Sequence, residues 1–143
     1  MDLAVNVNGA INDAEHATVS VLDRGFLFGE GVYETLRTYN RQPFLLDRHL
    51  DRLRASAGHL SLTVPLDDAK YADQIDETLA AISNKETELY IRLLITRGAG
   101  DLTYAPDSCP TPTTVIIVRP YAGASLSLDE KGITVVRSSI VRN

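Results

Sequence analysis

The 143-residue sequence contains no tryptophan, one methionine, one cysteine and no long hydrophobic run. Because Cys109 is alone, the sequence predicts no internal disulfide and no cysteine-based zinc site. No apolar stretch is long enough to span a bilayer, and Met1 precedes an alternating segment rather than a basic stretch with an apolar core. These absences predict a cytoplasmic protein without a signal peptide or a membrane span.

Positive charge is also scarce, because 14 Lys plus Arg face 19 Asp plus Glu and the net charge is -5. Binding to duplex nucleic acid needs a basic face, so we expect no nucleic-acid partner. The hydrophobic fraction of 44% and the charged fraction of 23% are those of an ordinary globular protein. Composition therefore argues against disorder, and the length suits one domain.

Hydrophobic periodicity predicts the elements of the fold. Leucine, isoleucine and alanine recur at spacings of 3, 4 and 3 in two segments, which predicts one helix capped by Asp47 and a second helix after Pro65. The turn signal Asn8-Gly9 predicts a hairpin. Alternation and β-branched content predict strands at 3–7, 18–22, 32–39, 44–46, 88–97, 113–119 and 132–141.

Together these elements predict an α+β fold, a two-layer sandwich of a mostly antiparallel sheet with two main helices. We place the N-terminal sandwich domain at residues 1–120. We interpret residues 121–143 as an interdomain segment that leads into the first strand of a truncated C-terminal domain.

Familiar cofactor and metal patterns are missing. The three histidines show no ligand spacing, and Gly29-Glu30-Gly31 does not continue as a dinucleotide loop because position 34 is glutamate and a strand follows. Cys109 lies in a polar loop with no histidine nearby in sequence, so a catalytic role for it is disfavoured.

Two polar clusters could still carry chemistry. Tyr33 and Glu34 lie on a predicted strand and should point to opposite faces, and spacing alone favours plain packing and solvation for them. His49, Arg52 and Ser56 share one flank of the first predicted helix. With its neighbouring arginines, Arg52 could bind an anionic group or could belong to a solvated basic face.

Arg92 is the third candidate, on the predicted strand face that also carries Tyr90. An arginine among strong strand formers is costly to bury unpaired, so a carboxylate partner from protein or substrate is a plausible expectation.

The three clusters lie in segments that resemble class IV aminotransferases, the fold-type IV enzymes that use pyridoxal 5'-phosphate. Residues 23–34 read DRGFLFGEGVYE, which resembles the DRGxxFGDGVYE signature of that family. Residues 49–53 (HLDRL) resemble its HxxRL helix, and residues 90–98 resemble its YIR and TRG strand and loop. Branched-chain aminotransferases, D-amino-acid aminotransferases and aminodeoxychorismate lyases share this pattern, and the branched-chain type is the nearest in motif.

The resemblance implies the N-terminal domain of the D-amino-acid aminotransferase-like fold and a role for each cluster. Arg52 matches the arginine that binds the phosphate of pyridoxal 5'-phosphate, and Tyr33 and Glu34 match residues that line the cofactor pocket. Tyr90 and Arg92 resemble the pair that orients an anionic part of the substrate. The resemblance also implies a homodimer, in which Phe28, Leu102 and Tyr104 shape the substrate pocket across the interface.

The substrates implied are an amino acid and a 2-oxo acid. D-amino-acid enzymes usually carry Arg and His after TRG, whereas Leu102 and Tyr104 stand at those positions here, so a branched-chain-like L-amino acid is favoured. A lyase-like enzyme and a D-amino-acid aminotransferase-like enzyme are the alternatives within the family, and the lyase's usual DRATQFGDG differs from residues 23–31.

A Schiff-base lysine is the missing part of the pattern. Transamination needs such a lysine, and Lys70, Lys85 and Lys131 do not lie in a motif that resembles the family's catalytic lysine. In the family that lysine follows a segment resembling residues 138–143. We therefore expect an N-terminal portion that ends before the catalytic lysine and is inactive by itself. The alternatives are a stand-alone module that binds a small anion or dimerises, and a purely structural domain.

Overall fold

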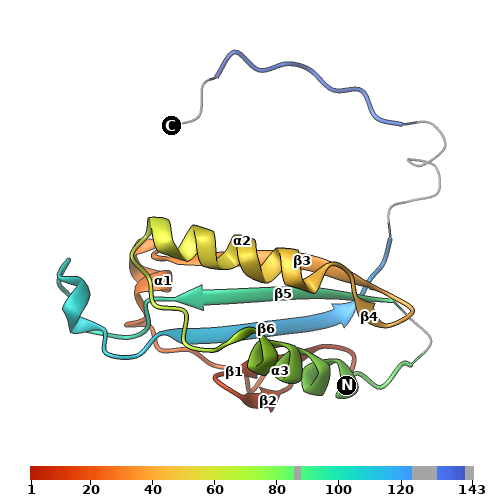
Figure 1. The fold of residues 1–143 in the computed structure, drawn as a ribbon, viewed down its shortest axis with the longest axis horizontal. Coiled ribbons are helices and arrows are strands. Elements are labelled where there is room, and N and C mark those ends of the chain that lie inside the picture. Colours follow the sequence, from red (N-terminus) through yellow and green to blue (C-terminus); the bar gives the residue numbers. More distant parts are fainter. Residues whose placement is uncertain (86–87, 124–131, 141–143) are drawn as a thin grey trace.

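The computed structural model describes residues 1–85, 88–123 and 132–140 as one sheet with helices packed on it, followed by an extended C-terminal segment (Figure 1). The strands form a six-stranded antiparallel sheet in the order β2-β1-β6-β5-β3-β4. Its strands are β1 (Ala4–Val7), β2 (Ala10–Asn12), β3 (Gly31–Tyr39), β4 (Gln42–Pro43), β5 (Leu89–Thr96) and β6 (Thr113–Pro120). The helices are α1 (Arg24–Phe28), α2 (Leu46–His59), α3 (Asp68–Ala80) and the short 3-10 helix η1 (Pro106–Ser108).

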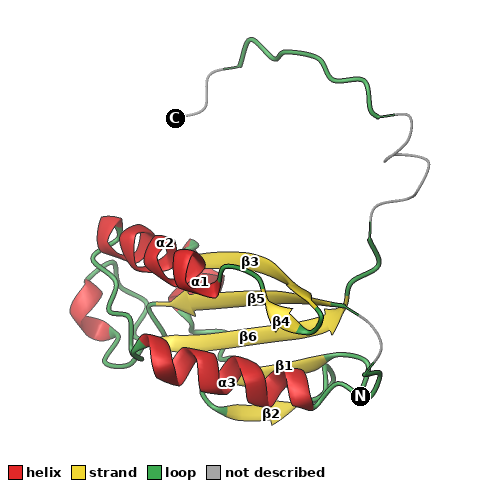
Figure 2. Ribbon diagram, turned by 45° about the vertical axis from the view of Figure 1, so that its right-hand side comes forward, coloured by secondary structure: helices red, strands yellow, loops and turns green. Residues whose placement is uncertain are grey.

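The predicted fold class is confirmed, because α2 and α3 cover one face of the sheet and form a second layer (Figure 2). Each helix buries an apolar stripe, with Leu50 and Leu53 in α2 and Ile75 and Leu79 in α3. The central strands supply alternate residues to the same core, among them Leu89, Ile91, Leu93, Ile95, Ile116 and Val118. The core therefore lies between the two helices and the sheet.

The first hairpin forms where Asn8-Gly9 predicts it. Asn8 and Gly9 have φ values of 52° and 91°, and the Gly9 amide donates to the side-chain oxygen of Asn6 at 2.7 Å. Both residues tolerate this left-handed conformation, so the local sequence determines the turn.

The start of α2 differs from the prediction. The cap position is Leu45, which has a left-handed backbone and no side-chain cap bond, and Asp47 lies inside the first turn. The strand predicted at 44–46 is also wrong, because the return strand is only Gln42–Pro43 and the helix has already begun at Leu46. The second helix does begin as expected, with the Asp67 carboxylate accepting from the Lys70 amide.

Two other predicted strands do not form. Residues 18–22 turn instead, because the Asp23 amide donates to the Ser20 carbonyl and the Leu22 amide donates to the Ser20 hydroxyl, which are local bonds in place of a strand ladder. Residues 132–140 are exposed and form no strand, since no neighbouring strand among the described residues offers them a hydrogen-bonding partner. Val141 lies outside the described residues. The boundary at residue 120 remains a prediction.

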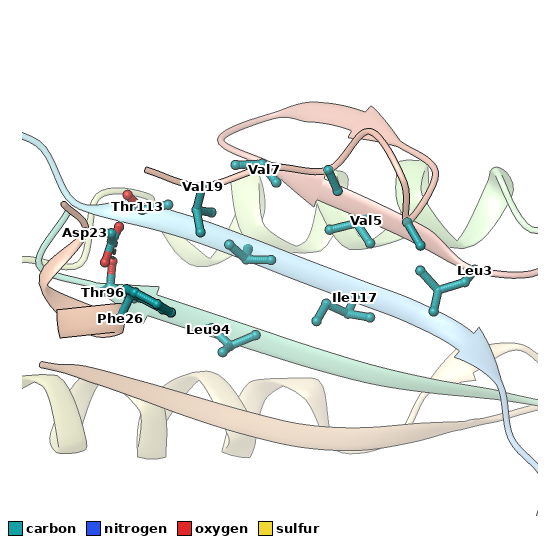
Figure 3. A pocket seen from close by; sticks show the side chains of 13 residues that line it. Leu3, Val5, Val7, Val19, Asp23, Phe26, Leu94, Thr96, Thr113 and Ile117 are labelled. Carbon is teal, nitrogen blue, oxygen red and sulfur yellow. Dashed lines mark hydrogen bonds between the residues drawn. The ribbon is translucent and has the colours of Figure 1, made fainter. Parts of the chain in front are cut away.

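The sheet face opposite the helices is open and largely apolar. A hollow of about 380 Å³ lies on it, lined by alternate residues of β1, β5 and β6, including Val5, Leu94 and Ile117. Val19 and Phe26, from the segment before β3, lie along its rim (Figure 3). The helices thus leave one whole face of the sheet for other contacts.

Candidate active site

The open face continues from the apolar hollow into a polar group on β3 and β5. Antiparallel pairing sets Thr35 opposite Arg92 and Tyr33 opposite Leu94, so alternate residues of both strands share this face. The Arg92 guanidinium carbon lies 4.1 Å from the centre of the Tyr33 ring, and the hydroxyls of Thr35 and Tyr90 are 3.5 Å apart. The register therefore brings Tyr33, Tyr90 and Arg92 together.

Arg92 does not have the protein carboxylate that the sequence favours for it. Among the described residues it forms no ion pair, and its Nε is buried without a hydrogen-bond partner. The Tyr33 ring is its partner instead, through a cation–π contact. A buried guanidinium N–H without an acceptor is costly, so this face is suited to receive an anionic ligand group.

Glu34 points to the opposite face, as strand alternation predicts, and is 5% exposed. Its carboxylate accepts from Arg52 Nε at 2.6 Å and from Arg52 Nη2, and His49 Nδ1 donates to it at 2.8 Å. Both partners lie on α2, which packs over β3. The structure therefore joins Glu34 to two of the helix residues that the sequence groups by spacing.

The charge of Arg52 lowers the pKa of the Glu34 carboxyl. The hydrogen bond from Arg52 is the largest cause, burial opposes it, and the His49 bond adds to the lowering. Arg52 itself is 66% exposed and binds Glu34 through one edge, while its Nη1 bonds no residue that the structure describes. One edge of the guanidinium is thus fixed, and the other can bind an oxyanion such as a phosphate.

The Arg52 and Arg92 clusters lie on opposite faces of the sheet, the first under α2 and the second on the open face. Among the described residues they form two separate groups. A hollow of about 350 Å³ along β3 is lined by Thr35 and Tyr90 from one cluster and by His49 from the other. The two groups therefore border a common hollow near the edge of the sheet.

Phe28 is the last residue of α1, and Leu102 and Tyr104 lie in the loop between β5 and β6. Leu102 and Tyr104 are 75% and 82% exposed, and the Tyr104 ring packs on Phe28 with 5.2 Å between centroids. The ring pair joins Phe28 to Tyr104, and the cation–π partner of Arg92 is Tyr33, outside this group.

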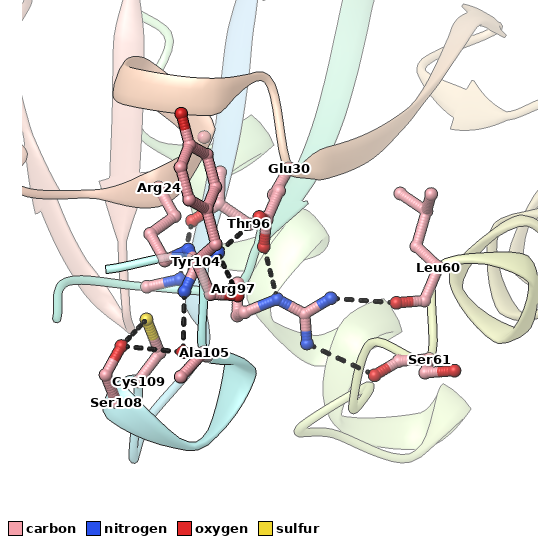
Figure 4. Close-up of polar contacts among 12 residues, drawn as sticks. Arg24, Glu30, Leu60, Ser61, Thr96, Arg97, Tyr104, Ala105, Ser108 and Cys109 are labelled. Carbon is pink, nitrogen blue, oxygen red and sulfur yellow. Dashed lines mark hydrogen bonds and ion pairs between the residues drawn. The ribbon is translucent and has the colours of Figure 1, made fainter. Parts of the chain in front are cut away.

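A network of three charged side chains, of which Arg24 is fully buried, lies under the loop between β5 and β6. The sequence did not predict this network. Arg24 is 1% exposed and pairs with Glu30, and Glu30 pairs with Arg97 (Figure 4). Burial would raise the pKa of the Glu30 carboxyl, but the bonds from Arg97 and Arg24 outweigh it and lower that pKa. The only sequence signal was the presence of these residues within the DRG, GEG and TRG motifs.

The two described lysines, Lys70 and Lys85, have their partners outside both clusters. Lys70 Nζ is 3.9 Å from the Asp67 carboxylate on α3, and Lys85 Nζ donates to the Ala80 carbonyl. Lys131 lies outside the described residues. In the part of the chain that the structure describes, no His, Cys, Asp and Glu side chains gather in a way that could hold a metal ion. Over the same residues, no helix has the length and apolarity to cross a bilayer.

Comparison with known proteins adds independent information. The family described as amino-transferase class IV matches residues 31–143. A putative branched-chain-amino-acid aminotransferase of Methanocaldococcus jannaschii is 39% identical over 98% of this chain, and an aminodeoxychorismate lyase of Bacillus subtilis is 31% identical over 90% of it. The match covers 47% of the first relative and 44% of the second, so the chain spans about half the length of these proteins.

A solved structure agrees with the sequence relatives. The crystal structure of a branched-chain aminotransferase from Thermoproteus uzoniensis with norvaline superposes with a TM-score of 0.73 at 29% identity. The superposition covers 83% of this chain and 41% of that one.

Proposed function

The chain belongs to the class IV amino-transferase family, and we propose that it is the N-terminal part of an aminotransferase that uses pyridoxal 5'-phosphate. The reaction would transfer an amino group between an amino acid and a 2-oxo acid. The observation that carries the proposal is Arg52, whose guanidinium is held by Glu34 along one edge and exposed along the other.

The described residues fit the phosphate end of this cofactor. Glu34 fixes one edge of the Arg52 guanidinium and His49 bonds the same carboxylate, so the exposed edge with Nη1 is oriented to bind a phosphate. When bound, pyridoxal 5'-phosphate supplies the electron sink for chemistry at the amino-acid Cα. In the proposed reaction, this chain binds and orients the phosphate of the cofactor. The described lysines, Lys70 and Lys85, have their partners on and after α3 rather than at Arg52.

Arg92 supports the substrate side of the proposal. The half-buried Arg92 side chain, which has no ion pair among the described residues, and the hydroxyl of Tyr90 on the same face can bind an anionic group of the substrate. Residues 98–105 carry no basic side chain, so a second anion clamp in this loop, as in D-specific enzymes, has no support. We therefore favour a branched-chain-like L-amino acid, with a lyase-like reaction as the alternative that the Bacillus subtilis relative supports.

Three further parts of the proposal concern the whole protein. A homodimer would place Phe28, Leu102 and Tyr104 against the substrate pocket, and their exposure supports this role. The protein would work in the cytoplasm. Because neither described lysine pairs with a residue of the site, the 143-residue chain would not transaminate by itself.

Binding of pyridoxamine 5'-phosphate tests the cofactor site, because this amine form cannot react with surface lysines. We expect the chain to bind it reversibly in an NMR or fluorescence titration. Arg52→Ala should weaken binding at least about tenfold, the loss typical of a charge-assisted phosphate contact. Arg54→Ala is the matched control, since Arg54 lies on the same helix and pairs with Asp68.

Equal affinity in Arg52→Ala and in the wild-type chain would refute a phosphate site and favour a purely structural domain. The predicted inactivity has its own test, an absorbance spectrum recorded after incubation with pyridoxal 5'-phosphate and dialysis. A retained band that changes on addition of L-glutamate would mean that one of the three lysines is reactive, and that this part of the proposal is wrong.

A further inference from the structure

The loop between β5 and β6 is held by an arginine that lies beneath it. Arg24 projects from α1 and is 1% exposed. Its Nη1 donates to the Ala105 carbonyl at 2.8 Å, and its Nη2 donates to Glu30 at 2.5 Å and to the Tyr104 carbonyl at 3.3 Å. One guanidinium therefore connects a carboxylate with two backbone carbonyls of the loop.

Glu30 extends this connection to a second arginine. Its other carboxylate oxygen accepts from Arg97 Nε at 2.5 Å. Arg97 also donates to the Leu60 and Ser61 carbonyls, at 2.8 and 3.2 Å, where α2 ends (Figure 4). The chain of contacts thus runs from the loop through Glu30 to the end of α2.

Backbone contacts close the loop against the same region. The Arg24 amide donates to the Gly98 carbonyl at 3.0 Å, and the Gly100 amide donates to Leu22 at 3.4 Å. Gly98 has φ +92°, and a Cβ there would lie 1.9 Å from the Thr111 carbonyl oxygen. The two ends of the loop are therefore in contact.

From this geometry we infer that Arg24, Glu30 and Arg97 are positioning residues that fix residues 98–109, and with them the exposed side chains of Leu102 and Tyr104, in the orientation that meets the substrate. The role of this loop at a substrate rests on the proposed function. The fixation itself is a property of the described residues and can be measured without cofactor.

The planar shape of arginine is essential to this role. Only a guanidinium can donate in fixed directions to Glu30, Tyr104 and Ala105 at once, whereas a lysine ammonium is a point charge on a flexible stem. The Arg24 group also lies 5.2 Å from the Phe28 ring, which in turn packs against Tyr104. Arg24→Lys therefore keeps the charge and removes the geometry.

The test uses Cys109, the only cysteine of the chain, as a reporter at the end of the loop. We expect Arg24→Lys and Glu30→Gln each to raise the rate of Cys109 alkylation by iodoacetamide by about tenfold, the change expected for loss of a charge-assisted hydrogen bond. Each rate is divided by the thiolate fraction measured for that variant, because the Arg24 side chain also interacts with the Cys109 thiol. Exchange of the Gly100 amide should accelerate by a similar factor. Amides of the β5–β6 ladder should keep their rates, because the loop opens locally.

Two further variants sharpen the result. Arg54→Lys is the matched control, because Arg54 also binds a carboxylate and a backbone carbonyl, those of Asp68 and Leu66, and it should leave Cys109 unchanged. Glu30→Asp keeps the carboxylate, so its rates of Cys109 alkylation and of Gly100 amide exchange should lie closer to those of the wild-type chain than the rates of Glu30→Gln do. Unchanged loop rates in both test variants would overturn the inference. Equal acceleration of loop and ladder would overturn it too, since the network would then serve global stability alone. Neither result depends on whether pyridoxamine 5'-phosphate binds.

Discussion

Replacing Glu34 by glutamine tests the link between β3 and α2 that orients Arg52. The side chain is 5% exposed and accepts hydrogen bonds from Arg52 Nε, Arg52 Nη2 and His49 Nδ1. Glutamine keeps the size of the side chain, but it removes the charge and can turn an NH₂ group toward these donors. Hydrogen bonds to a charged group contribute about 1.5–3 kcal/mol each. The two bonds from Arg52 contribute less than this, because solvent screens the exposed guanidinium.

We therefore expect Glu34→Gln to lower the free energy of unfolding by about 2 kcal/mol, and Tm by about 6–12 °C for a chain of this size. Urea unfolding and differential scanning calorimetry at pH 7 measure the change. Glu77→Gln, on the exposed face of α3, is the matched control and should change stability by less than about 0.5 kcal/mol.

The pH dependence of this difference has a definite sign. The pKa of Glu34 is lower in the folded chain than its ordinary value of 4.5, so its contribution is fully present above that value. It is lost as the pH falls through the lowered pKa. The gap between wild type and Glu34→Gln should therefore be constant near neutral pH and close in acid, whereas other carboxylates affect both proteins equally. A Tm change no larger than that of Glu77→Gln, or a gap that widens in acid, would refute this reasoning.

Two backbone and core predictions follow from the same structure. Gly98→Ala should lower the free energy of unfolding by more than about 2 kcal/mol, because a Cβ would clash with the Thr111 carbonyl. Gly29→Ala should lower it by only about 1–2 kcal/mol, because Gly29 has φ +70° but open space around it. Urea midpoints compare the pair, and equal losses would contradict the clash. Ile91→Ala, at a fully buried core position, should cost about 2–5 kcal/mol in the same assay, and a loss below about 1 kcal/mol would mean that the core is not packed as described.

The substrate side of the site could be predicted only in part. Arg92 and Tyr90 could be placed on one strand face because alternation is a local property, but the contact of Arg92 with Tyr33 depends on the register between β3 and β5. Of the two expected carboxylate partners of Arg92, one from the protein or one from the substrate, the described residues supply no protein carboxylate, and the substrate carboxylate stays a prediction. Alternation along a strand indicates which residues share a face. It does not indicate which strand pairs with that strand, or in which register.

The sequence by itself determined the two main helices, the long central strands, the hairpin at Asn8-Gly9 and the family motifs, because these depend on residues a few positions apart. Only the tertiary structure decided the partners of the buried charges. Glu34 meets Arg52 across 18 positions, and Glu30 meets Arg97 across 67. It also decided that residues 132–140 stay unpaired despite strand-like alternation, because a strand forms only where a neighbouring strand can accept and donate its hydrogen bonds.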